Sequence, residues 1–210
     1  MKSKAGIFCI ILGLLLIFGA TALTYWNQRE DDTAMEAVAQ IVPQLVQQIQ
    51  ENTGAEDVDP DVDVIPELQI PVDLLTEEDK KMTEVEIDGN LYIGYISIPA
   101  INMELPVMSN WSYPQLKIAP CRYSGSIRGE DLVLMAHNYK SHFGPISRLE
   151  IGDEVFFTDM DGKTTGYAVV GKDILDPTAV EVMTAGEYDL TLFTCTYGGA
   201  SRVTVYCDFI

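Results

Sequence analysis

The chain has little positive charge. Its 210 residues include 13 Lys and Arg against 32 Asp and Glu, which gives a formal net charge of −19. Nucleic acids and anionic lipid surfaces attract proteins through clustered Lys and Arg, because these side chains displace counterions or meet a negative surface. The charge balance therefore argues against nucleic acid and anionic lipid as ligands.

Cysteine and histidine are also scarce. Four cysteines are present, and Cys9 lies in an apolar N-terminal run, so an odd three remain in the rest of the chain. That count excludes a full disulfide framework and favours three free thiols, with a single bridge between Cys121 and Cys207 as the alternative. Only His137 and His142 are available for any reaction that combines a thiol with an imidazole.

One long hydrophobic run stands near the N-terminus. Residues 5–25 are uncharged and mostly apolar, and they follow Lys2 and Lys4. At about 1.5 Å per residue such a helix spans the roughly 30 Å of hydrocarbon in a bilayer. Lysines before the run and acids after it predict a single-pass plasma-membrane protein with its C-terminal domain outside the cell. The alternative is a cleaved signal peptide with an A-x-A-like site at residues 20–22, which exports the domain as well.

A strongly acidic segment follows the run. Residues 30–88 contain 18 acidic residues against only Lys80 and Lys81, whereas residues 90–210 contain 14 acidic and 8 basic residues. We therefore expect three parts: a cytoplasmic tip and transmembrane anchor over residues 1–29, an acidic linker over 30–89, and a folded domain over 90–210.

The linker itself has two patterns. Residues 32–50 repeat apolar side chains at helical spacing, with Asp32 or Thr33 as the expected N-cap and Pro43 as the expected kink. Residues 51–71 are rich in Asp and Pro and are typical of an extended tether.

From residue 90 onward short strand patterns dominate. Strands are expected over residues 91–98, 103–108, 131–137, 154–158, 164–174, 189–194 and 202–209. Residues 111–119 are ambiguous, and residues 143–149 indicate a short helical connection. The pattern predicts an all-β domain, and a closed barrel is favoured over a sandwich because it leaves no open edges.

The last two strands place a thiol beside a guanidinium. Period-two alternation divides the final strand between a polar face that begins with Arg202 and an apolar face that we expect to be core. That apolar face consists of Val203, Val205, Cys207 and Phe209. If the leucines of residues 189–194 share this core, Cys195 projects to the same accessible side as Arg202.

These residues suit acyl transfer. A Cys195 thiolate can attack a carbonyl, an imidazole can return a proton to the leaving amine, and the Arg202 guanidinium can stabilise the oxyanion. His137 ends an expected strand and is therefore held on a rigid element, whereas His142 lies in the following loop. We expect His137 to be the acid/base.

The same residues carry a family resemblance. The T-L-x-T-C motif that ends at Cys195, the arginine seven positions later and the upstream His137-Asn138 pair resemble the sortases, transpeptidases of Gram-positive cell surfaces. The resemblance covers residues 91–209. It implies a closed eight-stranded β-barrel with short helices, exported behind an N-terminal anchor. It also implies cleavage of an LPXTG-like sorting signal between Thr and Gly through a thioester on Cys195, followed by transfer to an amine of a peptidoglycan precursor or a pilin.

The resemblance assigns roles residue by residue. Cys195 corresponds to the nucleophile, His137 to the acid/base and Arg202 to the arginine that stabilises the oxyanion or orients the substrate. The expected substrate-binding residues are Thr194, Thr196, Tyr197 and Asn138, with residues 196–201 as one rim of a peptide groove. No cofactor and no metal are predicted, and the acidic loop residues that calcium-using members would need are better explained as solvated carboxylates. These acidic residues are Glu104, Asp159, Asp161 and Asp173.

Several departures bear on the subclass. Residues 172–188 are too few for the long helix of class B, and the chain carries neither the C-terminal transmembrane helix nor the Asp-Pro-aromatic lid of class C, because Asp61 follows Asp59-Pro60. Ala136 also stands where a glycine commonly precedes the histidine. The expectation is class D or an atypical class B member.

Two other functions are considered. An L,D-transpeptidase-like peptidoglycan enzyme would need a histidine immediately before the cysteine, where this chain has Phe193-Thr194. A catalytically inert membrane-anchored β module would hold Cys195 as a packed core residue. Fast alkylation of Cys195 alone would favour an enzyme, and protection of this thiol until denaturation would favour the inert module.

Overall fold

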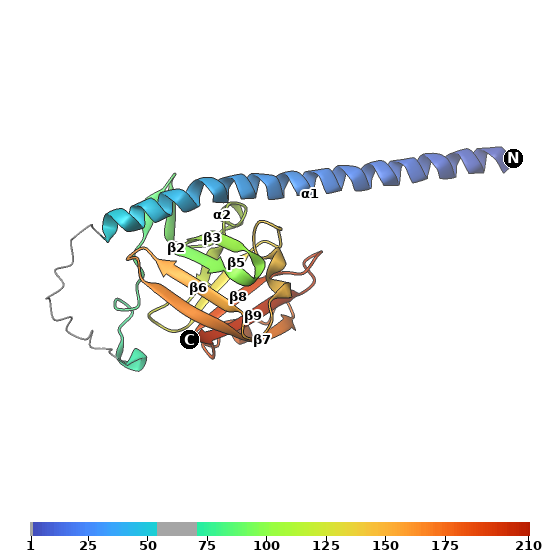
Figure 1. The fold of residues 1–210 in the computed structure, drawn as a ribbon. Coiled ribbons are helices and arrows are strands. Elements are labelled where there is room, and N and C mark those ends of the chain that lie inside the picture. Colours follow the sequence, from blue (N-terminus) through green and yellow to red (C-terminus); the bar gives the residue numbers. More distant parts are fainter. Residues whose placement is uncertain (1, 54–70) are drawn as a thin grey trace.

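The computed structural model describes residues 2–53 and 71–210. A long helix, α1 (Lys2–Asn52), lies along one side of a barrel of strands and projects beyond it toward the N-terminus (Figure 1). The expected tether, residues 51–71, lies almost entirely outside the described residues.

Helix α1 joins two segments that the sequence separates. The apolar run and the helix expected over residues 32–50 form one continuous element. The expected N-cap at Asp32 or Thr33 is wrong, since the Thr33 hydroxyl donates to the Arg29 carbonyl within the helix at 2.9 Å. No Gly or Pro stands between Tyr25 and Asp32, so nothing interrupts the backbone hydrogen bonds there.

The two halves of α1 differ in exposure. The N-terminal half is exposed along its apolar run, and this helix is long and apolar enough to cross a membrane. The C-terminal half buries Ala34, Ile41, Leu45 and Ile49 at helical spacing. Three of these side chains, those after Ala34, join a core cluster with Tyr92 and Met108 of the barrel. The amphipathic pattern of residues 32–50 therefore marks a helix docked on the barrel.

Within the described residues, one sheet contains nine strands. They are β1 (Val85–Ile87), β2 (Asn90–Ile98), β3 (Met103–Met108), β4 (Cys121–Ser124), β5 (Leu132–Ala136), β6 (Glu154–Asp159), β7 (Thr164–Leu175), β8 (Leu190–Cys195) and β9 (Arg202–Phe209). Their neighbour order is β1-β2-β3-β4-β5-β8-β9-β7-β6, and a further pairing of β2 with β6 closes the ring. Strands β2 to β9 thus form the expected closed eight-stranded barrel, and β1 extends it as a hairpin arm on β2.

A glycine allows the barrel to close. Gly94 of β2 has φ +144, and a Cβ there would lie 2.1 Å from the Thr158 carbonyl oxygen of β6. Only a residue without a side chain lets the two backbones approach so closely.

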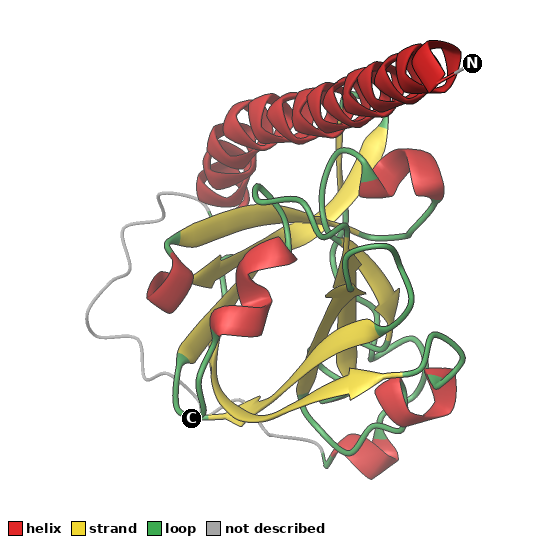
Figure 2. Cartoon of the chain, turned by 90° about the vertical axis from the view of Figure 1, so that its right-hand side faces the viewer, coloured by secondary structure: helices red, strands yellow, loops and turns green. Residues whose placement is uncertain are grey.

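Short helices lie around the barrel (Figure 2), and all but η1, which precedes β1, connect strands. They are η1 (Val72–Leu74), η2 (Pro99–Ile101), α2 (Tyr113–Leu116), η3 (Gly144–Arg148) and α3 (Val180–Met183). The ambiguous residues 111–119 contain α2, whose first turn is capped by the Ser112 hydroxyl accepting from the Gln115 amide at 3.3 Å. The connection expected over residues 143–149 is η3.

Only some of the side chains of β9 that the alternation predicts to be core are fully buried. Val205 and Cys207 are fully buried, and Val203 packs against the same cluster. Phe209 departs from the prediction, because it is 39% exposed at the end of the strand, where its ring stacks on Tyr167 with the centroids 5.1 Å apart.

Candidate active site

Three strand ends meet where the sequence predicts chemistry. Ala136 of β5 and Thr194 of β8 form the last pair between these two parallel strands. The residues that follow them, His137 and Cys195, therefore lie side by side. Neighbouring strands lie about 4.8 Å apart. On the other side of β8, Cys195 pairs directly with Arg202 of antiparallel β9. Residues that are far apart in the chain therefore gather at one end of the barrel.

Only the tip of this strand face is open. Phe193 shares the face of Cys195 in β8, but it is 4% exposed and packs in a small cluster with Val133 and Met183. Cys195 and Arg202 lie beyond that cover and are partly exposed. On the face of β8 that the alternation predicts to be accessible, only Cys195, which pairs with Arg202, is therefore partly exposed.

Thr194 holds the two strands together immediately before the site. Its hydroxyl is buried and donates to the Ala136 carbonyl at 2.8 Å. This bond fixes β8 to β5 one residue before Cys195 and His137. The Thr194 hydroxyl is thus engaged inside the protein, and only its main chain remains for a ligand.

Arg202 organises the loop that follows Cys195. Its Nη1 donates to the carbonyls of Gly199 at 3.1 Å and Ser201 at 3.2 Å. Thr196 closes the same loop, since its amide donates to the Ser201 carbonyl at 2.9 Å and its hydroxyl accepts from the Ser201 amide at 3.0 Å. Tyr197 stands at the tip and is 91% exposed. No carboxylate among the described residues pairs with Arg202.

The loop of residues 137–144 folds tightly on itself. The Phe143 amide donates to the His137 carbonyl at 3.2 Å, and the Gly144 amide donates to the Tyr139 carbonyl at 2.9 Å. A Cβ on Gly144 would lie 2.5 Å from that same Tyr139 oxygen, so the loop needs glycine there. Asn138 is partly buried in this loop, next to His137.

The two histidines differ in environment. His142 is fully buried, its Nε2 lies 3.3 Å from the Ile118 carbonyl, and burial lowers its pKa to about 4. His137 is partly exposed, and burial also lowers its pKa, although the charge of Glu30 opposes that shift. His142 is thus a neutral structural residue at neutral pH, and His137 is the imidazole that a ligand can reach.

The thiols separate in the same way. All four cysteines are free. Cys121 and Cys207 are fully buried in two different core clusters, and burial raises the pKa of each to about 12. The structure therefore contains the three free thiols that the sequence favoured, and Cys195 is the partly exposed one outside the core.

The acidic residues considered for calcium serve the turns and the surface. Asp159 accepts hydrogen bonds from the amides of Asp161 and Lys163 in the β6–β7 turn, and Asp161 forms an ion pair with Arg128 at 3.3 Å. Among the residues that the structure describes, no three His, Cys, Asp or Glu side chains gather as metal ligands would.

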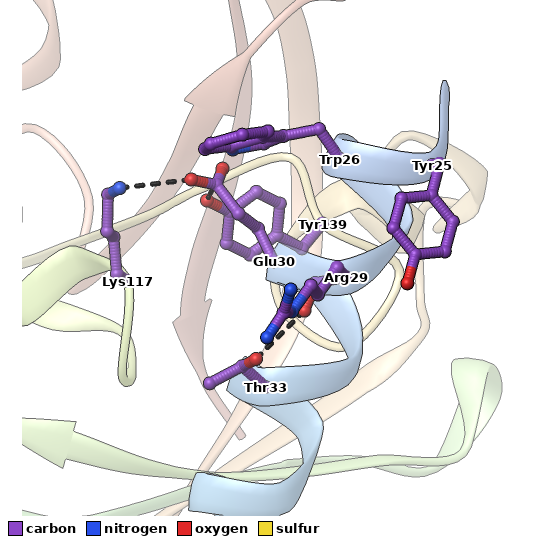
Figure 3. Close-up of a pocket in the computed structure, with 7 residues that line it drawn as sticks. All are labelled: Tyr25, Trp26, Arg29, Glu30, Thr33, Lys117 and Tyr139. Carbon is purple, nitrogen blue, oxygen red and sulfur yellow. Dashed lines mark hydrogen bonds and ion pairs between the residues drawn. The ribbon is translucent and has the colours of Figure 1, made fainter. Parts of the chain in front are cut away.

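Sequence reasoning missed the contribution of α1 to this region. A pocket of about 430 Å³ opens between α1 and the loop of residues 137–144, lined by Tyr25, Trp26, Arg29, Glu30, Thr33, Lys117 and Tyr139 (Figure 3). Tyr25 and Trp26 carried a signal in the sequence, but only as aromatic residues of a membrane interface. Nothing in the sequence indicated that Glu30 faces Tyr139.

Comparisons with known proteins agree with this arrangement. The family model described as Sortase domain matches residues 96–210, more than half of the chain. Sortase A of Bacillus anthracis is 30% identical over 121 residues, which are 55% of this chain, and the chain spans 57% of that relative's length.

Solved structures share the fold. Sortase C of Streptococcus pneumoniae, whose structure is described for its catalysis and pilin substrate specificity, is 25% identical with a TM-score of 0.52, covering 57% of this chain and 66% of that one. Sortase C1 of Streptococcus agalactiae is 24% identical with a TM-score of 0.52, covering 65% of this chain and 78% of that one. These relatives carry the labels A and C, and assignment to class D or an atypical class B stays a prediction. The barrel, its closure and the matched domain lead to one conclusion: the chain belongs to the sortase family.

Proposed function

We propose that this protein is a membrane-anchored cysteine transpeptidase that cleaves an LPXTG-like sorting signal and transfers the cleaved protein to an amine. Membership of a transpeptidase family supports an enzyme of this kind. The observation that carries the proposal is the meeting of Cys195, His137 and Arg202 at the ends of β8, β5 and β9.

The first half-reaction forms a thioester. The Cys195 thiolate attacks the carbonyl carbon of the Thr–Gly bond, and the Arg202 guanidinium, paired with Cys195 across the strands, stabilises the oxyanion. When the C–N bond breaks, the protonated His137 ring gives its proton to the leaving glycine amine. The acyl group then remains on the Cys195 sulfur.

The second half-reaction releases the product. An amine of a peptidoglycan precursor or a pilin attacks the thioester carbonyl, and neutral His137 accepts a proton from that amine. The C–S bond breaks, the thiolate is restored, and one peptide bond has replaced another. Water in place of the amine gives hydrolysis instead.

The chain offers two elements beside the reacting groups for substrate recognition. The loop of residues 196–201 is held by Arg202 and Thr196, so its exposed Tyr197 forms a rim beside the nucleophile. Asn138 adjoins His137 on the other side. The Thr194 hydroxyl acts indirectly, because its bond to Ala136 sets the spacing of the two strand ends.

The anchor supports action at a membrane surface. The apolar part of α1 is exposed, while its C-terminal half packs on the barrel, so the catalytic domain is held close to the segment that crosses the membrane. We propose single-pass topology with the barrel outside the cell.

Peptide cleavage by the full-length protein tests the function. A fluorogenic LPXTG-like peptide is incubated with the wild type, with Cys195→Ala and with Cys9→Ala, whose thiol lies in the exposed apolar run. We expect Cys9→Ala to match the wild type and Cys195→Ala to lose activity by at least about 10³-fold, because Cys121 and Cys207, the other thiols of the barrel, are buried and cannot form the acyl-enzyme. Mass spectrometry should detect the acyl adduct on Cys195, and added oligoglycine or a lysine peptide should yield the ligated product. Appreciable turnover by Cys195→Ala would remove Cys195 from the nucleophile's role.

A further inference from the structure

Two consecutive acidic residues of α1 hold the loop that carries His137. The Asp31 carboxylate accepts hydrogen bonds from the Ser141 hydroxyl at 2.6 Å and from the Ser141 amide at 3.0 Å. These contacts join residues 110 positions apart in the sequence. Helix α1 thus fixes the backbone of the loop of residues 137–144 at Ser141.

Glu30 makes the second contact with this region. One carboxylate oxygen forms an ion pair with Lys117 at 3.1 Å, and the other accepts a hydrogen bond from the Tyr139 hydroxyl at 3.2 Å (Figure 3). The bond from Lys117 is the largest influence on this carboxyl and lowers its pKa, so Glu30 is charged at neutral pH. Burial and the charge of Glu30 raise the pKa of Tyr139 to about 12, so its phenol keeps its proton and donates.

Tyr139 links Glu30 to the active-site histidine. Its ring centroid lies 4.8 Å from that of His137 with the planes tilted by 32°, and 5.4 Å from that of His142. The tyrosine ring therefore packs against both imidazoles, and its hydroxyl is held from α1. A substitution at Glu30 therefore affects His137 in two ways. It changes the position of the Tyr139 ring, and it changes the electrostatic potential at the imidazole.

We propose that Glu30 and Tyr139 are positioning residues for His137, so that the membrane-anchor helix completes the active site of the barrel. Glu30 holds the tyrosine against one face of the imidazole, and its negative charge favours the protonated ring. The inference rests on the proposed function, because it concerns the proton that His137 delivers to the leaving amine.

The charges around His137 determine the sign of the effect. Glu30 acts on it from α1, Lys117 from the segment after α2, and the Tyr139 ring from its own loop, while the charge of Asp31 acts on His142. Cys195 adjoins it from β8, and Arg202 lies one strand further away, on β9. Burial lowers the pKa of His137, Glu30 raises it and Lys117 lowers it. Because Lys117 is paired with Glu30, Glu30→Gln removes the favourable charge and leaves the unfavourable one uncompensated. The pKa of His137 therefore falls.

The chain allows a direct measurement because it contains only two histidines. We would label the full-length protein in nanodiscs with ¹⁵N-histidine and titrate both rings by NMR, assigning them with His142→Gln. Glu30→Gln should lower the pKa of His137 by at least about half a unit, which is a modest part of the energy of a charge pair near a protein surface. Tyr139→Phe, which keeps the ring and loses the hydrogen bond, should give a smaller decrease. Glu30→Asp keeps the charge and should restore most of the wild-type value.

Two controls separate this effect from damage to the fold. Glu36→Gln removes an exposed carboxylate from the same helix and should leave both titrations unchanged. His142 reports on the loop, because its pKa near 4 depends on burial. If Glu30→Gln shifts both histidines, the loop has been disrupted and the positioning role is refuted. An unchanged His137 titration in Glu30→Gln refutes it as well.

Activity provides the second readout. The alkaline limb of the kcat/KM profile, where the protonated imidazole is lost, should move to lower pH in Glu30→Gln by the shift that NMR measures, and should not move in Glu36→Gln. If the wild type cleaves no sorting peptide, the proposed function fails, while the titration still decides whether Glu30 is coupled to His137. If cleavage is normal and the limb stays in place in Glu30→Gln, the positioning role fails and the proposed function stands.

Discussion

Replacement of Leu45 by alanine tests whether helix α1 belongs to the core of the barrel. Leu45 is fully buried, in one cluster with Tyr92 and Met108 of β2 and β3. The change removes three carbon atoms, worth about 2.4 kcal/mol at about 0.8 kcal/mol for each buried group. A cavity term adds to this, and partial closure of the helix–barrel interface limits it, so we expect the free energy of unfolding to fall by about 3 kcal/mol.

That loss should be visible as a change in melting temperature. For a protein of this size each kcal/mol corresponds to about 2–4 °C, so the barrel should melt about 10 °C lower. Trp111 stacks on Tyr123 of β4 and reports on the barrel. Trp26 lies on α1, so a Trp26→Phe background leaves Trp111 as the single tryptophan. Full-length protein in detergent is heated while Trp111 fluorescence is followed.

The matched control is Met35→Ala on the same helix. Met35 is 61% exposed, so its loss should change stability by less than about 0.5 kcal/mol. If Leu45→Ala and Met35→Ala melt at the same temperature by Trp111 fluorescence, α1 does not contribute to the stability of the barrel. That result would favour the division into a linker over residues 30–89 and an independent domain over residues 90–210.

Further substitutions test the site and the residues that support it. Arg202→Lys keeps the charge and loses the planar fork, so kcat for peptide cleavage should fall by about 10²-fold or more; wild-type turnover would remove Arg202 from the site. His137→Ala should abolish cleavage, and His142→Ala should reduce it modestly through the fold; the reverse result would exchange their roles. Because the pKa of His142 is lowered to about 4 in the folded protein, unfolded chains bind a proton more readily below about pH 6.5. Urea unfolding should therefore show stability falling as the pH drops from about 6.5 toward 4, and His142→Asn should lose the part that His142 contributes and keep the part that comes from His137, whose pKa burial also lowers. Thr194→Val removes the buried bond to the Ala136 carbonyl and should cost about 1 kcal/mol in thermal unfolding, whereas an unchanged melting temperature would argue that the bond is weak.

Local patterns were sufficient for much of the fold. Alternation over residues 202–209 predicted β9 with its observed bounds, and turn residues separated it from β8. The same alternation identified the face shared by Cys195 and Arg202, because side chains on a strand follow a period of two regardless of what surrounds them. The strands β1 and β4 were missed, since three or four residues are too few to show a period.

Helix α1 shows where local patterns are insufficient. Its two apolar segments were recognised separately, one by length and one by helical spacing. The spacing of Ile41, Leu45 and Ile49 predicted a buried face, but it did not identify the covering surface. Joining the segments into one helix required only the absence of a breaker, whereas docking that helix on β2 and β3 required the folded barrel.

By itself the sequence determined the long apolar N-terminal segment, the all-β class and the three residue types of the expected reaction, because each depends on composition or on a short period. Tertiary structure alone decided that β5 and β8 are parallel neighbours, which brings His137 beside Cys195. It also decided that Glu30 meets Tyr139, 109 positions later. Contacts of such long range arise from strand register and helix docking, and neither leaves a periodic trace along the chain.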